Sequence, residues 1–136
     1  MTRAEAFRQL GTRANNIYRS LSARSADGRT VALTLWRDRF QGPAGALVYE
    51  LSDWGDWHRA NCQAFFRDLE HAVAHCGGIV HVVVVVRDRT ANPEVRTSDC
   101  YPAKNWAMKI TYLDSANGTF RLEQCAMPSA NRPLAA

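Results

Sequence analysis

The 136-residue sequence lacks the patterns that would point directly to a known chemistry. Its four cysteines are at least 14 residues apart, so the closely spaced pairs of structural zinc sites are missing. No glycine-rich phosphate loop precedes a helical segment, and no GxSxG nucleophile motif is present. We therefore expect four reduced thiols, no metal centre and no bound cofactor.

Long apolar runs are missing too. The most apolar stretch, GGIVHVVVVVRDR at residues 77–89, contains five consecutive valines but falls short of the roughly 18 to 20 residues of a membrane-spanning helix. The charged N-terminus is not followed by an apolar segment, which argues against a secretory signal. These features predict a cytoplasmic protein without membrane contact, and the chain length is that of one domain.

Lysine is scarce, because 15 of the 17 basic residues are arginine. Residues 1–40 contain eight arginines and three acids, residues 41–80 two arginines and five acids, and residues 81–136 seven basic groups and five acids. A basic surface attracts phosphate backbones, so this distribution favours DNA or RNA as the partner. A GC-rich genome would produce the same arginine bias without any ligand, and both interpretations stay open.

Local patterns predict the first half of the fold. Thr2 and Glu5 form a capping-box pattern at the start of a short helix over residues 2–10. Asp27 and Gly28 lie between two alternating segments, residues 17–24 and 31–35, which is the signature of a β-hairpin. After GPAG, a third strand is predicted over residues 46–52.

A helix from about residue 57 to residue 75 is predicted before the valine strand. The spacing of His71 and His75 suits a metal on a helix, but two solvent-facing histidines without a third ligand are usually surface residues. The 3.6-residue periodicity predicts an inward stripe of Cys62, Phe65, Phe66, Leu69, Val73 and Cys76, and an outward face with Arg67, Asp68, His71 and His75.

Residues 90–105, TANPEVRTSDCYPAKN, are predicted to form a long loop, and such loops are disproportionately functional. A second hairpin follows, with strands at residues 106–114 and 119–125 around Asn117 and Gly118. The order α-β-β-β-α-β-loop-β-β predicts one α+β domain over residues 1–125 and a flexible tail over residues 126–136. We expect a mixed, mostly antiparallel sheet of about six strands, with the long helix packed on one face.

The valine strand is predicted to be central and buried on both faces. Its second face must be covered by the N-terminal helix with the tail, by curling of the sheet into a half-barrel, or by a second copy of the chain. A homodimer is expected in the last case, because the monomer would otherwise expose a large apolar patch.

Residue types that bind nucleic acid gather near the end of the valine strand. Arginine binds phosphate in a bidentate manner, and tyrosine or tryptophan stacks on bases, although tryptophans at turns and strand ends also serve as lids on a core. We therefore favour a non-enzymatic nucleic-acid-binding or accessory module. Its expected ligand-binding residues are Arg37, Arg39, Arg87, Arg89, Arg96, Tyr101, Lys104 and Trp106, together with arginines of the first hairpin.

A metal-dependent nuclease is the first alternative. The element order matches the core of restriction-endonuclease-like nucleases, in which acids on neighbouring strands hold a divalent metal against the scissile phosphate. Asp27 or Asp38 would supply the first acid and Glu50 the second, although no lysine follows Glu50 at the required position.

A small-molecule-binding module is the second alternative. A curled sheet would close a pocket lined by Trp36, Tyr49, His81 and Trp106. His81 is either a buried histidine satisfied by a backbone carbonyl or a titrating group at the entry of the valine strand.

Overall fold

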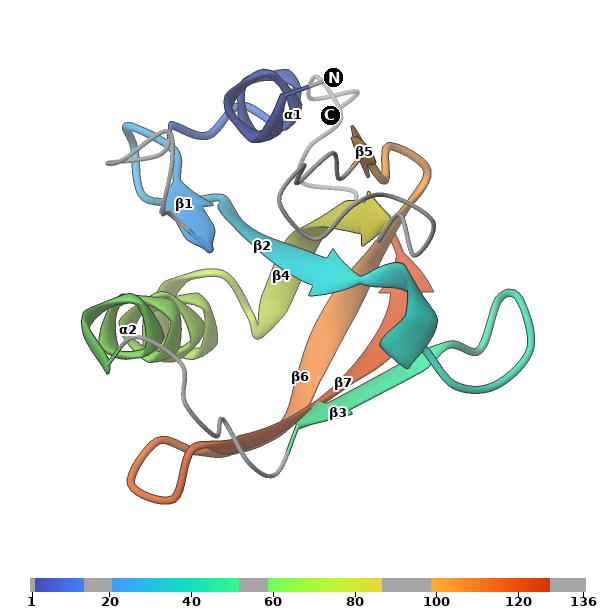
Figure 1. The fold of residues 1–136 in the computed structure, drawn as a ribbon. Coiled ribbons are helices and arrows are strands. Elements are labelled where there is room, and N and C mark those ends of the chain that lie inside the picture. The colour runs from blue at the N-terminus through green and yellow to red at the C-terminus, as the bar shows by residue number, and fades with distance from the viewer. Residues whose placement is uncertain (1, 14–20, 52–58, 87–98, 128–136) are drawn as a thin grey trace, which may run out of the picture.

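The computed structural model describes residues 2–13, 21–51, 59–86 and 99–127, shown as a ribbon in Figure 1. The predicted α+β class with one long helix is confirmed. Among the described residues, no helix is long and apolar enough to cross a membrane. In chain order the elements are α1 (Arg3–Gln9), β1 (Ser22–Arg24), β2 (Val31–Trp36), the 3-10 helix η1 (Arg37–Arg39), β3 (Val48–Leu51), α2 (Arg59–His75), β4 (Ile79–Val86), β5 (Asp99–Pro102), β6 (Trp106–Asp114) and β7 (Thr119–Ala126).

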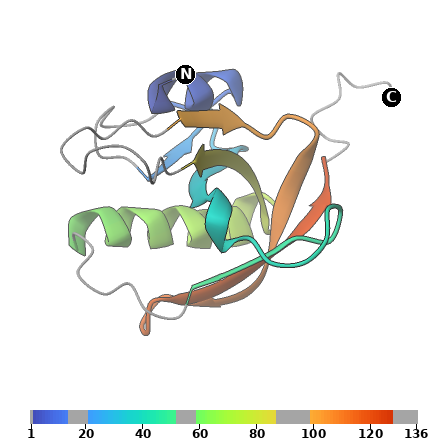
Figure 2. The ribbon, with the colours of Figure 1, turned by 45° about the vertical axis from the view of Figure 1, so that its right-hand side comes forward.

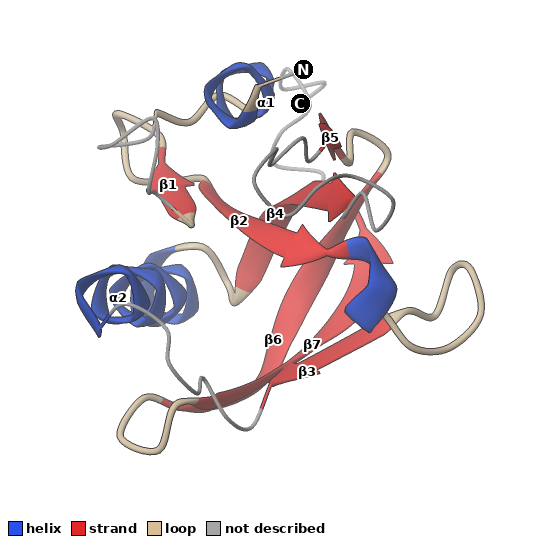
Figure 3. Ribbon diagram, in the orientation of Figure 1, coloured by secondary structure: helices blue, strands red, loops and turns tan. Residues whose placement is uncertain are grey.

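The seven described strands belong to one open sheet, in the order β1-β2-β4-β6-β7-β3, with β5 beside the second half of β4. β2 and β4 are parallel, and the other neighbouring pairs are antiparallel. The mixed, mostly antiparallel sheet and the central position of the valine strand are therefore confirmed, and Figure 3 distinguishes the strands from the helices.

The strand β5 lies in residues that the sequence predicted to be loop. β5 forms because β4 is longer than its pairing with β6. β6 pairs with β4 only at Ile79 and Val80, so the backbone groups of residues 83–86 need a different strand beside them. Residues 99–102 provide that neighbour, with Tyr101 opposite Val84. Buried backbone groups need hydrogen-bond partners, so β5 completes the sheet and raises the strand count from about six to seven.

Both predicted hairpins are present. In the first, Ser22 lies opposite Leu33 and Arg24 lies opposite Val31. The loop between these strands contains Gly28, whose φ of +73° lies in the left-handed region that glycine adopts without strain. In the second hairpin, β6 pairs with β7 along nearly the whole of both strands. Ala126, expected to begin a flexible tail, is the last residue of β7, and residues 128–136 lie outside the described ranges.

The larger core lies between α2 and the inner face of the curved sheet. Phe65, Phe66 and Leu69 of α2 are buried there with Phe120 and Leu122 of β7. The centroid of the Phe120 ring lies 5.5 Å from that of Phe65 and 5.9 Å from that of Phe66. The sheet therefore curves around α2 without closing, and Figure 1 shows β6 and β7 passing below the helix.

The buried side of α2 is rotated relative to the predicted stripe. Val73, expected to point inward, is 52% exposed, whereas Ala72 is fully buried and Asp68, expected to point outward, is 8% exposed. The reason is the first hairpin, which packs along one flank of α2 and supplies Ser22 and Arg24 as partners for Asp68. Helical periodicity locates an apolar stripe but does not report a polar contact with another element.

The smaller core lies on the opposite face of the sheet, under α1. Ala6 and Phe7 are fully buried in one cluster with Ala32, Val83 and Val85. Figure 2 shows α1 and α2 on opposite sides of β2 and β4. The N-terminal helix, one of the three predicted covers, therefore covers the second face of the valine strand, and the reason for expecting a homodimer disappears.

Replacing Phe7 by alanine should lower the free energy of unfolding by about 3 to 5 kcal/mol, because its ring fills the core between α1 and the valine strand. Urea unfolding followed by circular dichroism measures the change. Val73→Ala, on the exposed side of α2, is the control and should change the same quantity by less than about 0.5 kcal/mol. Equal effects of the two substitutions would contradict the placement of α1 over the core.

Candidate functional site

The parallel pairing of β2 and β4 brings their carboxyl ends to one edge of the sheet. Trp36, the last residue of β2, lies opposite Val85 of β4, and β5 pairs with the same end of β4. In open α/β sheets, ligands bind in the crevice outside the carboxyl ends of parallel strands. We define the strand-end surface as the residues with ligand-binding side chains around this edge and in the adjoining connection from β5 to β6: Arg37, Arg39, Tyr101, Lys104 and Trp106.

The helix η1 follows β2 directly and carries Arg37 and Arg39, both of which are exposed. The next residue, Phe40, fastens η1 to the sheet. Its ring packs edge-to-face on Tyr49 of β3, with centroids 5.1 Å apart, and on Trp106 of β6, with centroids 5.9 Å apart. Two edge-to-face contacts with strands of the sheet hold the two arginines on an aromatic base.

The contact between Phe40 and Trp106 also shows which predicted residues come together. It places η1 against the start of β6, where Lys104 precedes Trp106 by two residues and is exposed. Tyr101 lies on β5 at the same edge of the sheet. Five of the eight predicted ligand-binding residues thus lie on η1, on β5, or between β5 and the start of β6, with Lys104 beside the middle of β4 rather than at its end. The other three, Arg87, Arg89 and Arg96, lie outside the described residues.

The positive charges of the strand-end surface are open to solvent. Arg37, Arg39 and Lys104 are exposed and make no ion pair with another residue in the described ranges. Asp38, between the two arginines, is exposed as well. Asp99, the first residue of β5, lies opposite the last residue of β4 at the same edge, so the three cations and two carboxylates leave a formal charge of +1, which suits a ligand that carries phosphates.

The described arginines of the first hairpin, Arg24 and Arg29, do not join this surface, contrary to expectation. Arg24 is bound to Asp68 of α2, and Arg29 lies in the turn before β2, at the opposite end of that strand from η1. The six residues of β2 span about 20 Å. The described arginine surface is therefore narrower than the sequence predicted and is confined to the carboxyl edge of the sheet.

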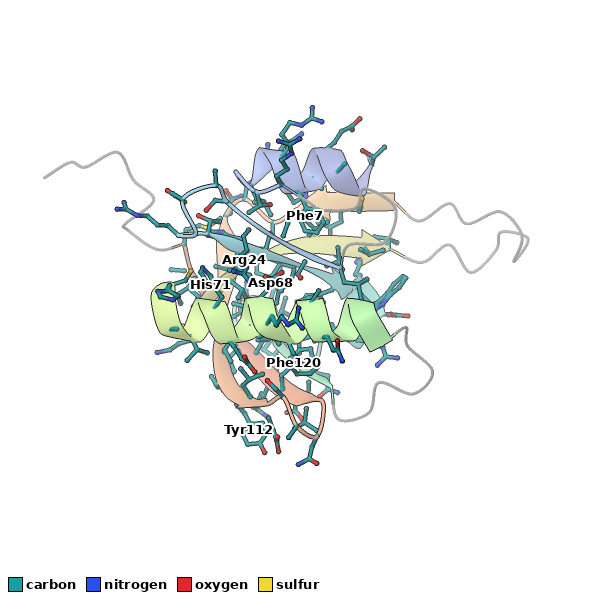
Figure 4. All side chains as sticks on the ribbon, turned by 90° about the vertical axis from the view of Figure 1, so that its left-hand side faces the viewer. Phe7, Arg24, Asp68, His71, Tyr112 and Phe120 are labelled. Atoms are coloured by element: carbon teal, nitrogen blue, oxygen red, sulfur yellow. The ribbon has the colours of Figure 1, made fainter. Side chains whose placement is uncertain are left out.

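A polar network that the sequence did not predict joins the first hairpin to α2, and Figure 4 shows Arg24, Asp68 and His71 close together. The Asp68 carboxylate accepts hydrogen bonds from the Ser22 hydroxyl and the Arg24 guanidinium. Arg24 also donates to Nδ1 of His71 over 3.4 Å, and Nε2 of His71 lies 2.7 Å from the Gly28 carbonyl oxygen. Because a guanidinium only donates, we infer that Nδ1 accepts and that Nε2 carries the proton given to Gly28.

This network holds the first hairpin on α2, and its side chains are poorly suited to catalysis or metal binding. The Cys76 thiol donates to the same Gly28 carbonyl oxygen over 3.6 Å. Burial, followed by the charge of the Asp27 carboxylate, raises the pKa of that thiol, so it stays protonated at neutral pH and is a poor nucleophile. The rings of His71 and His75 are 4.7 Å apart, but the described residues contain no group of three or more side chains placed to hold a metal ion.

The three acids of the nuclease alternative do not lie on neighbouring strands of the sheet. Asp27 lies in the turn before β2, where a 2.6 Å hydrogen bond from the Ser25 hydroxyl lowers the pKa of its carboxyl group. Asp38 lies at the other end of β2, and Glu50 lies on β3, where it pairs with Arg121 of β7. Since β4, β6 and β7 separate β2 from β3, the neighbouring acid-bearing strands of that nuclease arrangement are not formed.

The four pocket candidates are divided between the two faces of the sheet. Tyr49 is buried in the larger core and Trp106 packs against it, whereas Trp36 packs against the smaller core under α1. His81 alternates along β4 with valines of the larger core, so its side chain points to the α1 face. The structure therefore does not bring these four side chains together around one cavity.

No known protein family, curated protein or solved structure matches this chain. The geometry and charge of the strand-end surface are therefore the observations from which a function is inferred.

Asp68→Asn should lower the free energy of unfolding by about 1.5 to 3 kcal/mol, because the buried carboxylate accepts two hydrogen bonds, one from a charged donor. Chemical unfolding at neutral pH measures the loss. Glu70→Gln, an exposed acid on the same helix, is the control and should have little effect. If Asp68→Asn is as harmless as the control, the network does not fasten the hairpin to α2.

His81 makes stability depend on pH. Burial lowers its pKa from the ordinary value of 6.5, because the charged ring would lose its water on the α1 face. The unfolded chain binds the proton more readily, so stability present above about pH 6.5 should fall as the pH drops towards the lower value of the folded state. Urea midpoints should therefore decline more steeply between about pH 7.5 and 5.5 in the wild type than in His81→Gln. If the urea midpoints of the two proteins decline equally with pH, His81 does not cause the pH dependence.

Proposed function

We propose that this protein is a nucleic-acid-binding module that holds the phosphate backbone on its strand-end surface. The observation that carries the proposal is the pair of exposed arginines, Arg37 and Arg39, at the carboxyl edge of the parallel pair β2 and β4, with the exposed Lys104 in the connection from β5 to β6. Arginine presents a rigid fork of donors to phosphate oxygens, and lysine adds a point charge. The contacts of Phe40 support the proposal, because they fix η1 in place before a ligand arrives.

The segment that joins β4 to β5 carries a small positive charge. It contains Arg87, Arg89 and Arg96 together with Asp88 and Glu94, so three cations and two carboxylates give a formal charge of +1. Arg87 and Arg89 follow the last residue of β4 within three positions.

The proposed role is binding rather than catalysis. Ser22, Asp68 and His71 are the polar side chains most suggestive of chemistry, and their hydrogen bonds hold the first hairpin on α2. They also lie on a different part of the molecule from η1, which follows the opposite end of β2. A surface of cations with an aromatic neighbour recognises phosphates and bases without cleaving them.

Binding should be strongly salt-dependent, because each cation that neutralises a phosphate releases counterions. The double substitution Arg37→Ala/Arg39→Ala should weaken binding of DNA or RNA and reduce the slope of log affinity against log salt by about 1 to 2. Fluorescence anisotropy over a salt series measures both quantities.

The control for this experiment is Arg29→Ala/Lys109→Ala, which removes the same charge from exposed residues away from the strand-end surface. It should leave the salt slope nearly unchanged. Equal losses in the two double variants would mean that binding follows net charge alone, and wild-type affinity that does not respond to salt would overturn the proposal.

A further inference from the structure

We propose that the strand-end surface selects single-stranded over duplex nucleic acid, with Tyr101 as the platform on which an unpaired base stacks. This inference rests on the proposed function, since the cations of the same surface supply the phosphate contacts. It adds the class of nucleic acid and the residue that selects it.

The exposure of Tyr101 follows from its place in the sheet. It lies on β5, which pairs with the second half of β4 and stands beside the main row of strands. Its neighbour Cys100 is buried in the smaller core, so the alternation of the strand turns Tyr101 to the other face. The side chain is 42% exposed, which leaves a large part of the ring accessible to a ligand.

Tyr101 and Phe40, the residue that follows η1, lie on one face and at one end of the sheet. Leu35, Val84 and Tyr101 form a row across β2, β4 and β5, and the first two point into the larger core. Phe40, which fastens η1, packs against that same core. Two strand spacings place the Cα atom of Tyr101 about 10 Å from that of Leu35, which is two residues before Arg37.

Trp106, the other aromatic residue of the surface, is already engaged. Its ring packs edge-to-face against Phe40 and is half-buried against the larger core. Its contribution is to position η1. Tyr101 is therefore the described aromatic side chain of this surface that is most accessible to a base.

An accessible aromatic ring close to exposed cations favours the binding of single-stranded over duplex nucleic acid. The bases of a duplex stack on each other and are read through grooves, which a recognition helix or a two-stranded ribbon enters. The strand-end surface offers neither, because η1 has three residues and β5 is held against β4. Unpaired bases, by contrast, stack on an exposed aromatic ring whatever their sequence, while arginines hold the backbone.

Fluorescence anisotropy with a labelled oligothymidylate and a labelled duplex of the same length, at one ionic strength, tests this inference. The wild type should bind the single strand more tightly. Tyr101→Ala should weaken single-strand binding by about 5- to 150-fold, the range that one base–aromatic stack contributes, and leave duplex binding unchanged. Tyr101→Phe keeps the ring and should behave like the wild type.

Tyr112→Ala is the matched control. Tyr112 is 55% exposed on β6, and Figure 4 shows it on the opposite side of α2 from Phe7 and α1. Its loss should change neither affinity. A second control is an abasic strand, which keeps the phosphates and lacks the bases. The wild type should bind it about as weakly as Tyr101→Ala binds oligothymidylate.

The outcomes separate the two proposals. If Tyr101→Ala binds the single strand like the wild type while Arg37→Ala/Arg39→Ala weakens both ligands, the stacking role is overturned and the proposed function stands. A wild type that binds duplex at least as tightly as single strand also overturns the selection. A wild type that binds neither ligand overturns the proposed function and this inference with it.

Discussion

The backbone and both faces of β4 impose the constraint on which the other elements depend. An eight-residue strand that is buried on both faces needs hydrogen-bond partners along two edges and apolar cover above and below. β2 occupies one edge, β6 and β5 share the other, and α2 and α1 cover the faces. The edge of β4 that is shared by β5 and β6 determines where Lys104 lies. The chain follows β4 until the Ala103 N–H donates to the Val82 carbonyl, then leaves it before β6 begins, and so exposes Lys104.

The charged side chains fall into two groups with different tasks. Arg24 and Arg121 are paired with carboxylates of neighbouring elements, where they join the first hairpin to α2 and β7 to β3. Arg37 and Arg39 at the carboxyl edge of the parallel pair, and Lys104 in the connection from β5 to β6, make no such pair within the described residues. The first group gives two of the 15 arginines a structural role, and the second supplies the charge that a phosphate ligand would meet.

Features set by neighbours in the sequence could be predicted, and features set by distant partners could not. The capping box of Thr2 and Glu5 is present at α1, and Gly28 lies in the loop of the first hairpin, because both depend on a few adjacent residues. The burial of Asp68 depends on Ser22, which is 46 positions away and leaves no periodic trace. The gathering of η1 with β5 follows from the parallel register of β2 and β4, which composition and periodicity do not specify.

The parallel pairing of β2 with β4 also bears on how the chain reaches its native state. Leu33 and Val82 are neighbours in the sheet although they are 49 positions apart, and η1, β3 and α2 all lie between them. Closing so long a loop is entropically costly, so pairing of this kind forms slowly. Until it forms, the valine run is an uncharged segment with strong β-propensity, which other unfolded chains can capture. Arg87, Asp88 and Arg89 follow the run directly in the sequence, and charges that flank an apolar strand act as gatekeepers against aggregation, so these residues protect the nascent chain whatever the folded protein binds.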